Sequence, residues 1–206
     1  MTGTPADRGT PTTDERLRAH TIGELRPYAD KVVIAEYDPA WPRRFEREAA
    51  RIGTALGASA LTIDHIGSTS VPGLAAKPII DIAMAVADSS DEDAYVPAVE
   101  RAGYELRIRE ADWHEHRVFR ARTALGHGRD VNLHVYSAGC VLLERYRVFR
   151  DRLRANDDDR ARYERTKREL AARDWKYVQN YADAKTAVVD EIVRAAGEPT
   201  GACLTY

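Results

Sequence analysis

The alternation of apolar and polar positions predicts mixed strands and helices up to about residue 136, and helices alone beyond it. Short apolar or alternating runs bounded by Gly, Pro and Asp are typical of strands. They occur at residues 32–34, 61–66, 79–87, 104–109, 113–122 and 130–136. Apolar residues three and four positions apart are typical of helices. This spacing occurs at residues 17–28, 38–57, 91–102, 139–155, 158–173 and 175–196. A turn at Gly126-His127-Gly128 is predicted to join the last two strands.

This order of elements predicts an α+β fold, in which a mixed β-sheet with flanking helices is followed by a C-terminal helical cap. We expect the core at residues 31–137 and the cap at 138–197. Residues 1–30 are interpreted as a disordered or weakly ordered extension, because the first 14 are rich in Thr, Pro and Gly and lack periodicity. Residues 198–206 are predicted to form a flexible tail.

Composition narrows the class of protein further. The chain has 206 residues, 44% of them hydrophobic, which suffices for one domain with a substantial core. No apolar window is long enough to span a bilayer and no apolar segment follows Met1, so we expect a cytoplasmic protein without a membrane partner. The formal net charge of −2 argues against nucleic acid as a partner. Cys140 and Cys203 fit no disulfide or zinc pattern, and nothing in the sequence specifies an oligomeric state.

A loop of small residues lies between the strands predicted at 61–66 and 79–87. It opens with Gly67-Ser68-Thr69-Ser70 and closes with Lys77-Pro78. Small residues let a backbone approach a bulky anion, and N–H groups and hydroxyls can hold phosphate oxygens. Asp81 then interrupts an apolar strand, where an uncompensated carboxylate is costly, so we interpret it as a Mg²⁺ ligand. The alternatives are that Ser68 only caps a helix and that Lys77 is a surface lysine.

The block from Gly67 to Ile82 resembles the GrpB family (UPF0157), a branch of the nucleotidyltransferase superfamily that includes DNA polymerase β. The likeness extends from about Val33 to about Ala196. It also includes Arg117-Val118-Phe119-Arg120, Asn132-Leu133-His134-Val135, Phe149-Arg150-Asp151, and Tyr181 with Lys185. The resemblance implies a nucleotidyltransferase-like α+β fold that binds Mg²⁺ and ATP, or another nucleoside triphosphate. The implied activity is transfer of AMP to a small-molecule hydroxyl or carboxylate, which in the second case activates an acid for amide or ester formation.

The resemblance also assigns roles to individual residues. Asp81 and His134 are the expected catalytic residues, with Asp81 holding the metal and His134 positioning or deprotonating the acceptor. Asp130 shares a strand face with Asn132 and His134 and is the candidate second metal ligand. The nucleotide-binding residues are expected to be Gly67, Ser68, Thr69, Ser70, Lys77, Arg120, Asn132, Tyr181 and Lys185.

The sequence departs from the superfamily pattern at two places. Two carboxylates usually alternate on one strand, but Ala83 stands two positions after Asp81. Asn132 and His134 stand where a third carboxylate is expected on a neighbouring strand. These changes argue against ordinary two-metal chemistry and favour catalysis with one metal, or binding without turnover.

Two other kinds of protein remain open from the residues alone. One is a nucleotide-binding or regulatory module that has lost turnover, which the absence of a carboxylate at Ala83 favours. The other is a metal enzyme built on His114, His116 and His134. His65 is interpreted either as a core histidine or as a ligand, and the Tyr163/Lys167 pair either as an amphipathic helix edge or as part of the site.

Overall fold

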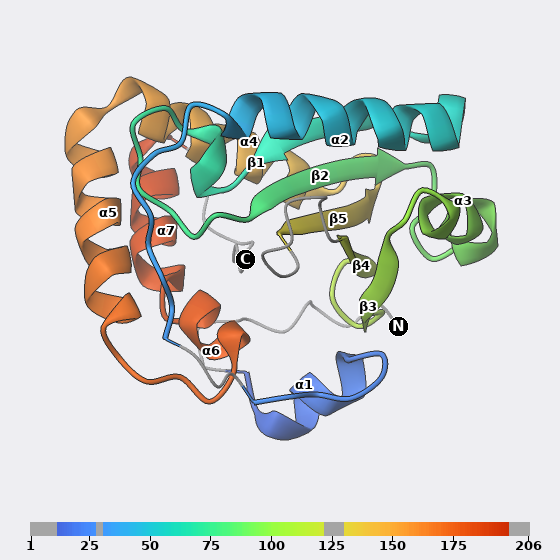
Figure 1. Ribbon diagram of the computed structural model, residues 1–206, viewed down its shortest axis with the longest axis horizontal. Helices are drawn as coiled ribbons and strands as arrows, with labels where there is room; N and C mark the ends of the chain where they lie inside the picture. Colours follow the sequence, from blue (N-terminus) through green and yellow to red (C-terminus); the bar gives the residue numbers. More distant parts are fainter. Residues whose placement is uncertain (1–11, 28–30, 122–129, 198–206) are drawn as a thin grey trace.

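A mixed five-stranded β-sheet lies at the centre of the computed structural model, which describes residues 12–27, 31–121 and 130–197 (Figure 1). Its strands are β1 Thr62–Ile66, β2 Ile80–Val86, β3 Glu105–Glu110, β4 His116–Ala121 and β5 Val131–Ser137. The strand order is β1-β2-β5-β4-β3. Only the central β2/β5 pair is parallel, and the other three pairs are antiparallel.

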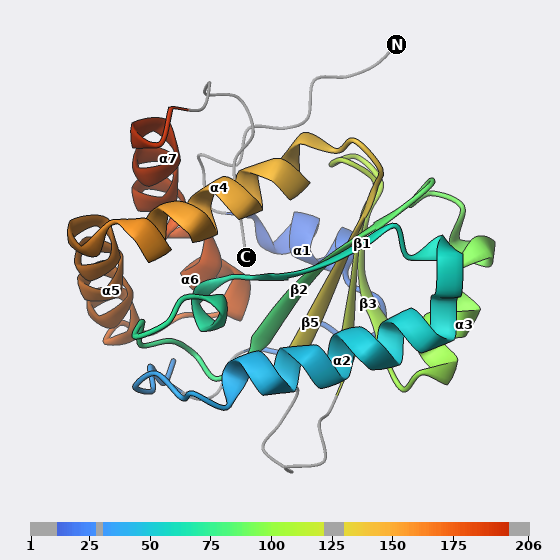
Figure 2. The same ribbon diagram turned by 90° about the horizontal axis from the view of Figure 1, so that it is seen from above.

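One face of the sheet is mostly apolar. Ile80, Ile82 and Met84 of β2 point to it together with Leu133 and Val135 of β5, as the period of two along a strand requires. Two helices bury this face, α2 Trp41–Leu56 and α3 Val96–Arg101, and Figure 2 shows α2 running along it. The alternate positions of the same strands therefore carry the polar residues to the opposite face.

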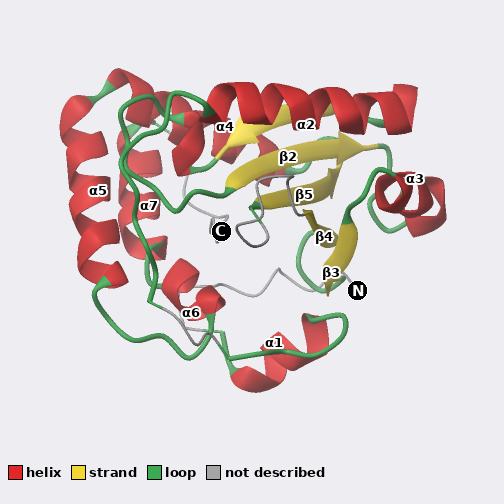
Figure 3. Ribbon diagram, viewed as in Figure 1, coloured by secondary structure: helices red, strands yellow, loops and turns green. Residues whose placement is uncertain are grey.

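The opposite face is divided into an apolar half and a polar half. Helices α4 Val141–Ala155 and α7 Thr186–Ala195 cover the apolar half, and Figure 2 shows α4 on the side opposite α2. In this half Ala83, Ala85 and Tyr136 pack against Tyr146 and Phe149. Helices α5 Asp157–Ala171 and α6 Val178–Asp183 complete the cap, which Figure 3 shows as a helical block beside the sheet. The polar half is left facing α6.

An N-terminal strap, defined as residues 12–27, crosses in front of the polar half. It contains α1 Asp14–His20, with Leu17 buried, whereas the spacing predicts a helix at 17–28. At one end the Thr12 backbone N–H donates to Asp183 Oδ2 of α6 at 2.8 Å. At the other end the Ile22 N–H donates to the Arg107 carbonyl of β3 at 2.9 Å. The strap thus connects the cap to the edge strand (Figure 1).

The predicted α+β class, sheet and helical cap are confirmed. Besides the first helix, four predicted elements are corrected. Residues 32–34 form no strand, and the next residue, Ala35, makes an isolated bridge to Ala76. The helix predicted at 91–102 is a 3₁₀ turn at Glu92–Ala94 followed by α3, because Pro97 fits only the first turn of a helix. The helix predicted at 175–196 is divided into α6 and α7.

The fourth correction concerns the start of β4. The strand predicted from Trp113 begins at His116, because His114 and Glu115 adopt positive φ angles of 54° and 49° and form a turn. The predicted turn at 126–128, the tail and the first 11 residues lie outside the described residues. No helix within the described part of the chain is both long and apolar enough to cross a bilayer.

Candidate functional site

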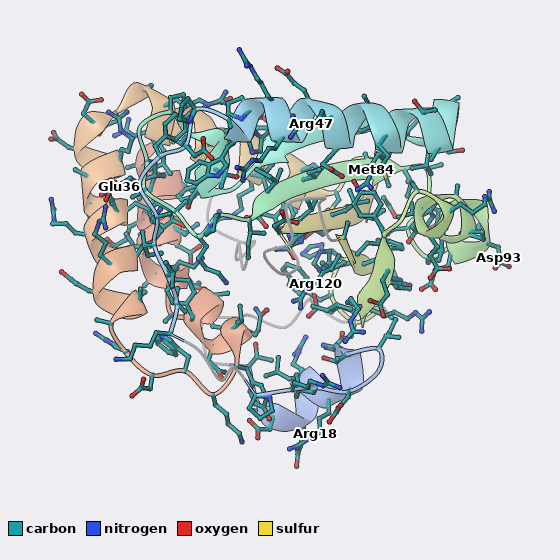
Figure 4. All side chains as sticks on the ribbon, viewed as in Figure 1. Arg18, Glu36, Arg47, Met84, Asp93 and Arg120 are labelled. Atoms are coloured by element: carbon teal, nitrogen blue, oxygen red, sulfur yellow. The ribbon has the colours of Figure 1, made fainter. Side chains whose placement is uncertain are left out.

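A cleft of about 910 Å³ lies over the polar half of the sheet. Its walls are the sheet, the loop between β1 and β2, the cap and the strap. Ten of the residues predicted from sequence line it: Ser68, Thr69, Lys77, Asp81, Arg120, Asp130, Asn132, His134, Tyr181 and Lys185. Figure 4 labels Arg120, which lies between the sheet and α1. The neighbouring Arg117 is on the other face, where its Nε donates to Glu92 at 2.6 Å.

Gly67 and Ser70 shape the loop and do not line the cleft. Gly67 has φ 69° and ψ −175°, a backbone region that is essentially restricted to glycine. A Cβ at this position would lie 2.7 Å from Asp81 Oδ2, so the glycine lets the loop pack directly on the Asp81 side chain. The Ser70 hydroxyl donates to the Gly67 carbonyl at 2.6 Å and is buried. We therefore remove Ser70 from the set of proposed nucleotide contacts.

Thr69 and His65 form a buried hydrogen-bonded pair beneath the loop. The Thr69 hydroxyl donates to the Ile79 carbonyl at 3.1 Å, so its oxygen accepts from His65 Nε2, also at 3.1 Å. The His65 ring stacks on Phe45 with centroids 4.7 Å apart. Burial lowers the pKa of His65 to about 4, so the ring is neutral at physiological pH. His65 is a core histidine that is hydrogen bonded through Nε2 and stacked on Phe45.

Asp81 is the central group of the cleft. The parallel register of β2 and β5 places it opposite Asn132, whose Nδ2 donates to Asp81 Oδ1 at 2.8 Å. His134 Nε2 lies 3.9 Å from the same oxygen. Burial alone would raise the pKa of Asp81, but His134, Asn132 and Lys185 more than offset it and hold this pKa below its ordinary value. Asp81 is therefore ionised at neutral pH.

Lysine side chains from the loop and the cap gather around Asp81. The ammonium groups of Lys77 and Lys185 lie 5.9 Å and 4.9 Å from the centre of the Tyr181 ring. Burial and the nearby Lys77 lower the pKa of Lys185 to about 8, while Asp81 opposes the change. Burial and Arg120 also lower the pKa of Lys77. Tyr181 thus holds two lysines by cation–π contacts.

The Tyr163/Lys167 pair also belongs to this wall of the cleft. Lys167 lines the cleft, donates to the Ala75 carbonyl and lies 4.8 Å from the centre of the Tyr163 ring. Burial, followed by the charge of Lys185, lowers the pKa of Lys167 well below its ordinary value. The cap therefore contributes two lysines to the cleft, and the sequence had favoured only Lys185.

The absence of a second carboxylate beside Asp81 has a structural counterpart. Ala83 is 1% exposed, packs in the apolar half of the sheet face and is paired with His134 across the strands. Asp130 lines the cleft from the start of β5, one position before the residue opposite Ile80. Two residues were predicted to bind the metal ion, Asp81 and Asp130. Among the described contacts, those with Asn132 and His134 are made by Asp81.

The structure does not bring His114, His116 and His134 together as the alternative metal site would require. His114 lies in the turn before β4, so it does not share a strand face with His116. The ring nitrogens of His116 and His134 that face each other are hydrogen bonded, at 3.0 Å. Over residues 12–27, 31–121 and 130–197, no group of three His, Cys, Asp or Glu side chains is arranged to hold a metal ion.

Sequence reasoning missed a buried polar chain behind His134. His116 Nδ1 lies 2.8 Å from Glu110 Oε2, and its Nε2 lies 3.0 Å from His134 Nδ1. His20 of the strap reaches the other carboxylate oxygen of Glu110, at 3.4 Å. In the sequence, the only sign of this chain was a carboxylate at Glu110 and an imidazole at His116. The strand order, which the sequence does not display, brings both residues close to β5.

Comparison with known proteins identifies the family. The family model described as GrpB protein matches residues 31–195. This chain belongs to the GrpB family. A UPF0157 protein of Halalkalibacterium halodurans is 53% identical over 191 residues, covering 93% of this chain and 95% of that protein. The crystal structure of the conserved protein GrpB from Enterococcus faecalis superimposes with a TM-score of 0.69 at 33% identity, covering 80% of this chain and 96% of the other. The predicted family and fold class are confirmed.

Two other similarities, one in sequence and one in structure, are more distant. A dephospho-CoA kinase of Mycolicibacterium paratuberculosis is 31% identical over 180 residues, covering 75% of this GrpB chain but 43% of the kinase. A structure of the Cid1 poly(U) polymerase bound to MgATP covers 66% of this chain at 13% identity, with a TM-score of 0.39. The second likeness is too remote to support a conclusion about activity.

The close packing of Gly67 on Asp81 can be tested by comparing two glycines. Gly67→Ala should destabilise the protein more than Gly73→Ala, because both have positive φ but a Cβ at Gly73 meets nothing within 4 Å. We expect about 1–2 kcal/mol for the backbone strain at Gly73, and roughly 1–3 kcal/mol more at Gly67 for overpacking against the carboxylate. Urea unfolding measures both. Equal losses in the two variants would show that Gly67 does not support Asp81.

Proposed function

We propose that the cleft binds the magnesium complex of a nucleoside triphosphate and transfers its nucleotidyl group to a small-molecule acceptor. The observation that carries the proposal is the concentration of positive charge around one ionised carboxylate. Lys77, Lys167 and Lys185 line the cleft close enough for the charge of Lys77 to affect Lys185, and that of Lys185 to affect Lys167. Buried ammonium groups that repel one another favour an anionic ligand, which would relieve the repulsion.

The dimensions of the cleft suit a ligand of this size. The end of the cleft proposed to bind the phosphates is formed by Ser68, Lys77 and the cap. The far end lies over β3, three strand spacings from β2 and therefore about 14 Å away. A triphosphate with its nucleoside and a small acceptor fit within such a length and within 910 Å³. Tyr181 is occupied by lysines, so we assign it to their positioning and not to stacking on a base.

Mg²⁺ enters this proposal as part of the substrate. Magnesium in nucleotide sites is commonly held by one or two protein carboxylates together with phosphate oxygens. Asp81 supplies one such carboxylate, its Oδ1 already accepting from Asn132. Asp130, which also lines the cleft, is the second candidate ligand. A metal ion that arrives with the triphosphate needs few ligands from the protein.

His134 is proposed to activate a hydroxyl acceptor. Its ring is buried, and its Nε2 has no hydrogen-bond partner in the described part of the chain and faces the Asp81 side of the cleft. As the acceptor oxygen bonds to the α-phosphorus, the bond from that phosphorus to the bridging oxygen breaks and pyrophosphate leaves. The hydroxyl proton passes to His134 Nε2. A carboxylate acceptor would form an acyl adenylate without giving up a proton.

The second candidate function is nucleotide binding without turnover, as in a regulatory module. The apolar environment of Ala83 favours it, because the usual second carboxylate has no place there. A segment similar to this chain also occurs within a dephospho-CoA kinase, of which it covers 43%, and this favours the catalytic alternative without identifying the acceptor.

Calorimetric titration with ATP, GTP, CTP and UTP tests the binding step, with and without Mg²⁺. Asp81→Asn should weaken binding of the magnesium complex, because a metal ligand is lost. The same change should strengthen binding of metal-free nucleotide, because a negative charge is removed beside the phosphates. Transfer is then tested with a nucleotide labelled on the α-phosphate and pools of small hydroxyl and carboxylate compounds. Absence of binding to all four nucleotides would refute the proposal, and binding without transfer would select the regulatory alternative.

The pH dependence of binding should report Lys185. The charged and titratable groups that act on it or lie close to it are Lys77, Asp81, Asp183, Lys167 and the Tyr181 ring. The free protein loses the Lys185 proton above pH 8, whereas a bound triphosphate favours the ammonium form. Affinity for Mg·ATP should therefore be constant below pH 7 and fall above pH 8, by up to about tenfold per pH unit.

Matched variants isolate this effect. Lys185→Arg keeps its charge throughout the range, so its affinity should depend less on pH. Lys176→Arg, at an exposed position, should behave as the unmodified protein does. An unchanged pH slope in Lys185→Arg would assign the effect to another group.

Restoring the carboxylate at position 83 should not restore two-metal chemistry. Ala83→Asp would place a charge in an apolar cluster with His134 as its strand neighbour. We expect a loss of roughly 2 kcal/mol or more in stability, and no gain in Mg²⁺-dependent transfer. Ala85→Asp, on the same face but paired with Tyr136, should be more destabilising because no basic group is adjacent. Thermal unfolding and label transfer measure the two effects, and a clear gain in transfer by Ala83→Asp would contradict this prediction.

A further inference from the structure

A chain of hydrogen bonds leads from Glu110 through His116 to His134. Glu110 is 6% exposed, His116 3% and His134 5%, so all three groups are buried. The distances are 2.8 Å from Glu110 Oε2 to His116 Nδ1, and 3.0 Å from His116 Nε2 to His134 Nδ1. The two imidazole planes are parallel to within 2°. Burying a carboxylate and two imidazoles is costly unless each is paired, so this arrangement requires specific partners.

The chain fixes which nitrogen of each ring carries hydrogen. An ionised Glu110 can only accept a hydrogen bond, so His116 must donate to it from Nδ1. In a neutral ring His116 Nε2 then has a lone pair and accepts from His134 Nδ1. Nε2 of His134 is therefore left unprotonated. It faces the cleft 3.9 Å from Asp81 Oδ1 and has no hydrogen-bond partner among the described residues.

We propose that Glu110 and His116 are positioning residues, which orient His134 and hold it in the tautomer that accepts a proton from the acceptor. The proposal rests on the function proposed above for His134. It assigns a role to Glu110, which the sequence did not select, and gives His116 a role other than metal binding. The base takes one proton from the attacking hydroxyl, and the resulting positive charge on the histidine pair is stabilised by the Glu110 carboxylate. No oxidant or other reactant is needed.

The packing around His116 supports a positioning role. The Tyr136 ring stacks on His116 with centroids 4.5 Å apart and planes within 6°. Trp113 contacts the same ring in an edge geometry, at 5.4 Å. These rings prevent His116 from rotating away from His134, so one orientation of both imidazoles is retained.

The N-terminal strap contributes a further residue to the chain. His20 Nδ1 lies 3.4 Å from Glu110 Oε1, and its Nε2 lies 2.9 Å from Asp112 Oδ1. His20 thus holds the carboxylate oxygen that His116 does not use. The strap precedes residues 31–195, the range that the GrpB family model matches. The contact between His20 and Glu110 therefore joins a residue outside this range to one inside it. We assign His20 to the orientation of Glu110.

The tautomer can be measured directly, without a nucleotide. Nitrogen-15 NMR of the protein labelled at histidine should show His134 protonated at Nδ1 and unprotonated at Nε2 at neutral pH. The reverse assignment in the unmodified protein would overturn the proposal. Because this measurement needs no substrate, it remains decisive even if the cleft binds no nucleotide and the proposed function fails.

Glu110→Gln tests the role of the carboxylate. A glutamine can donate from its amide to His116 Nδ1, so His116 would donate from Nε2 and His134 would carry its hydrogen on Nε2. We expect the His134 tautomer to reverse, and transfer to hydroxyl acceptors to fall by roughly 10²–10⁴-fold in kcat. KM for the nucleotide and transfer to carboxylate acceptors, which need no base, should stay the same. Glu105→Gln, at an exposed position of the same strand, is the matched control.

Two outcomes of the variant experiment would contradict the proposal. One is a folded Glu110→Gln protein that keeps the original His134 tautomer. The other is equal loss with hydroxyl and carboxylate acceptors, which would indicate general damage to the site. If Glu110→Gln does not fold, His20→Gln serves instead, since it removes a strap contact and leaves the buried pair in place. It should lower hydroxyl transfer selectively, with Arg18→Gln of the same helix as control, and no selective loss would remove His20 from the chain.

Discussion

The site depends on one constraint, which is that the carboxylate of Asp81 must remain ionised on a partly buried strand. Three features of the fold meet it. The parallel register of β2 and β5 supplies Asn132 as a direct donor and His134 as a basic neighbour. Gly67 leaves room for the carboxylate, because any side chain there would collide with it. The cap adds Lys185, which also lowers the pKa of Asp81.

The helical cap places two lysines, Lys167 and Lys185, in the cleft. Lys167 and Lys185 lie about a hundred residues after Asp81 in the chain, yet α5, α6 and α7 return them to the cleft. Burial first, and a neighbouring ammonium group second, lower the pKa values of both lysines, so their charged forms are costly in the free cleft. Tyr163 and Tyr181 reduce this cost through contacts between their rings and the ammonium groups. A cap held together only by apolar contacts would not need these pairs.

Much of this arrangement can be predicted from the alternation of polar and apolar residues along the strands. The alternation along β2 and β5 predicts that Asp81, Asn132 and His134 leave the core on one face, and the cleft has them together. Other features depend on pairing between strands distant in sequence. Glu110 and His116 reach His134 only because β4 lies between β3 and β5. The inward direction of the Ser70 hydroxyl and the break between α6 and α7 likewise follow from tertiary packing, which local propensity does not encode.

The departures from the two-metal pattern are connected through His134. A carboxylate at position 83 would be the strand neighbour of this histidine and would add a second anion near its Nε2, which already lies 3.9 Å from Asp81 Oδ1. An alanine there keeps His134 Nε2 available and allows Tyr136 and Tyr146 to pack behind it. Asn132 keeps a hydrogen bond to Asp81 without adding negative charge. The three residues Ala83, Asn132 and His134 therefore act together, since each reduces the negative charge that a pair of metal ions would require. This agrees with the proposal that the ligand is a polyanion that brings its own magnesium.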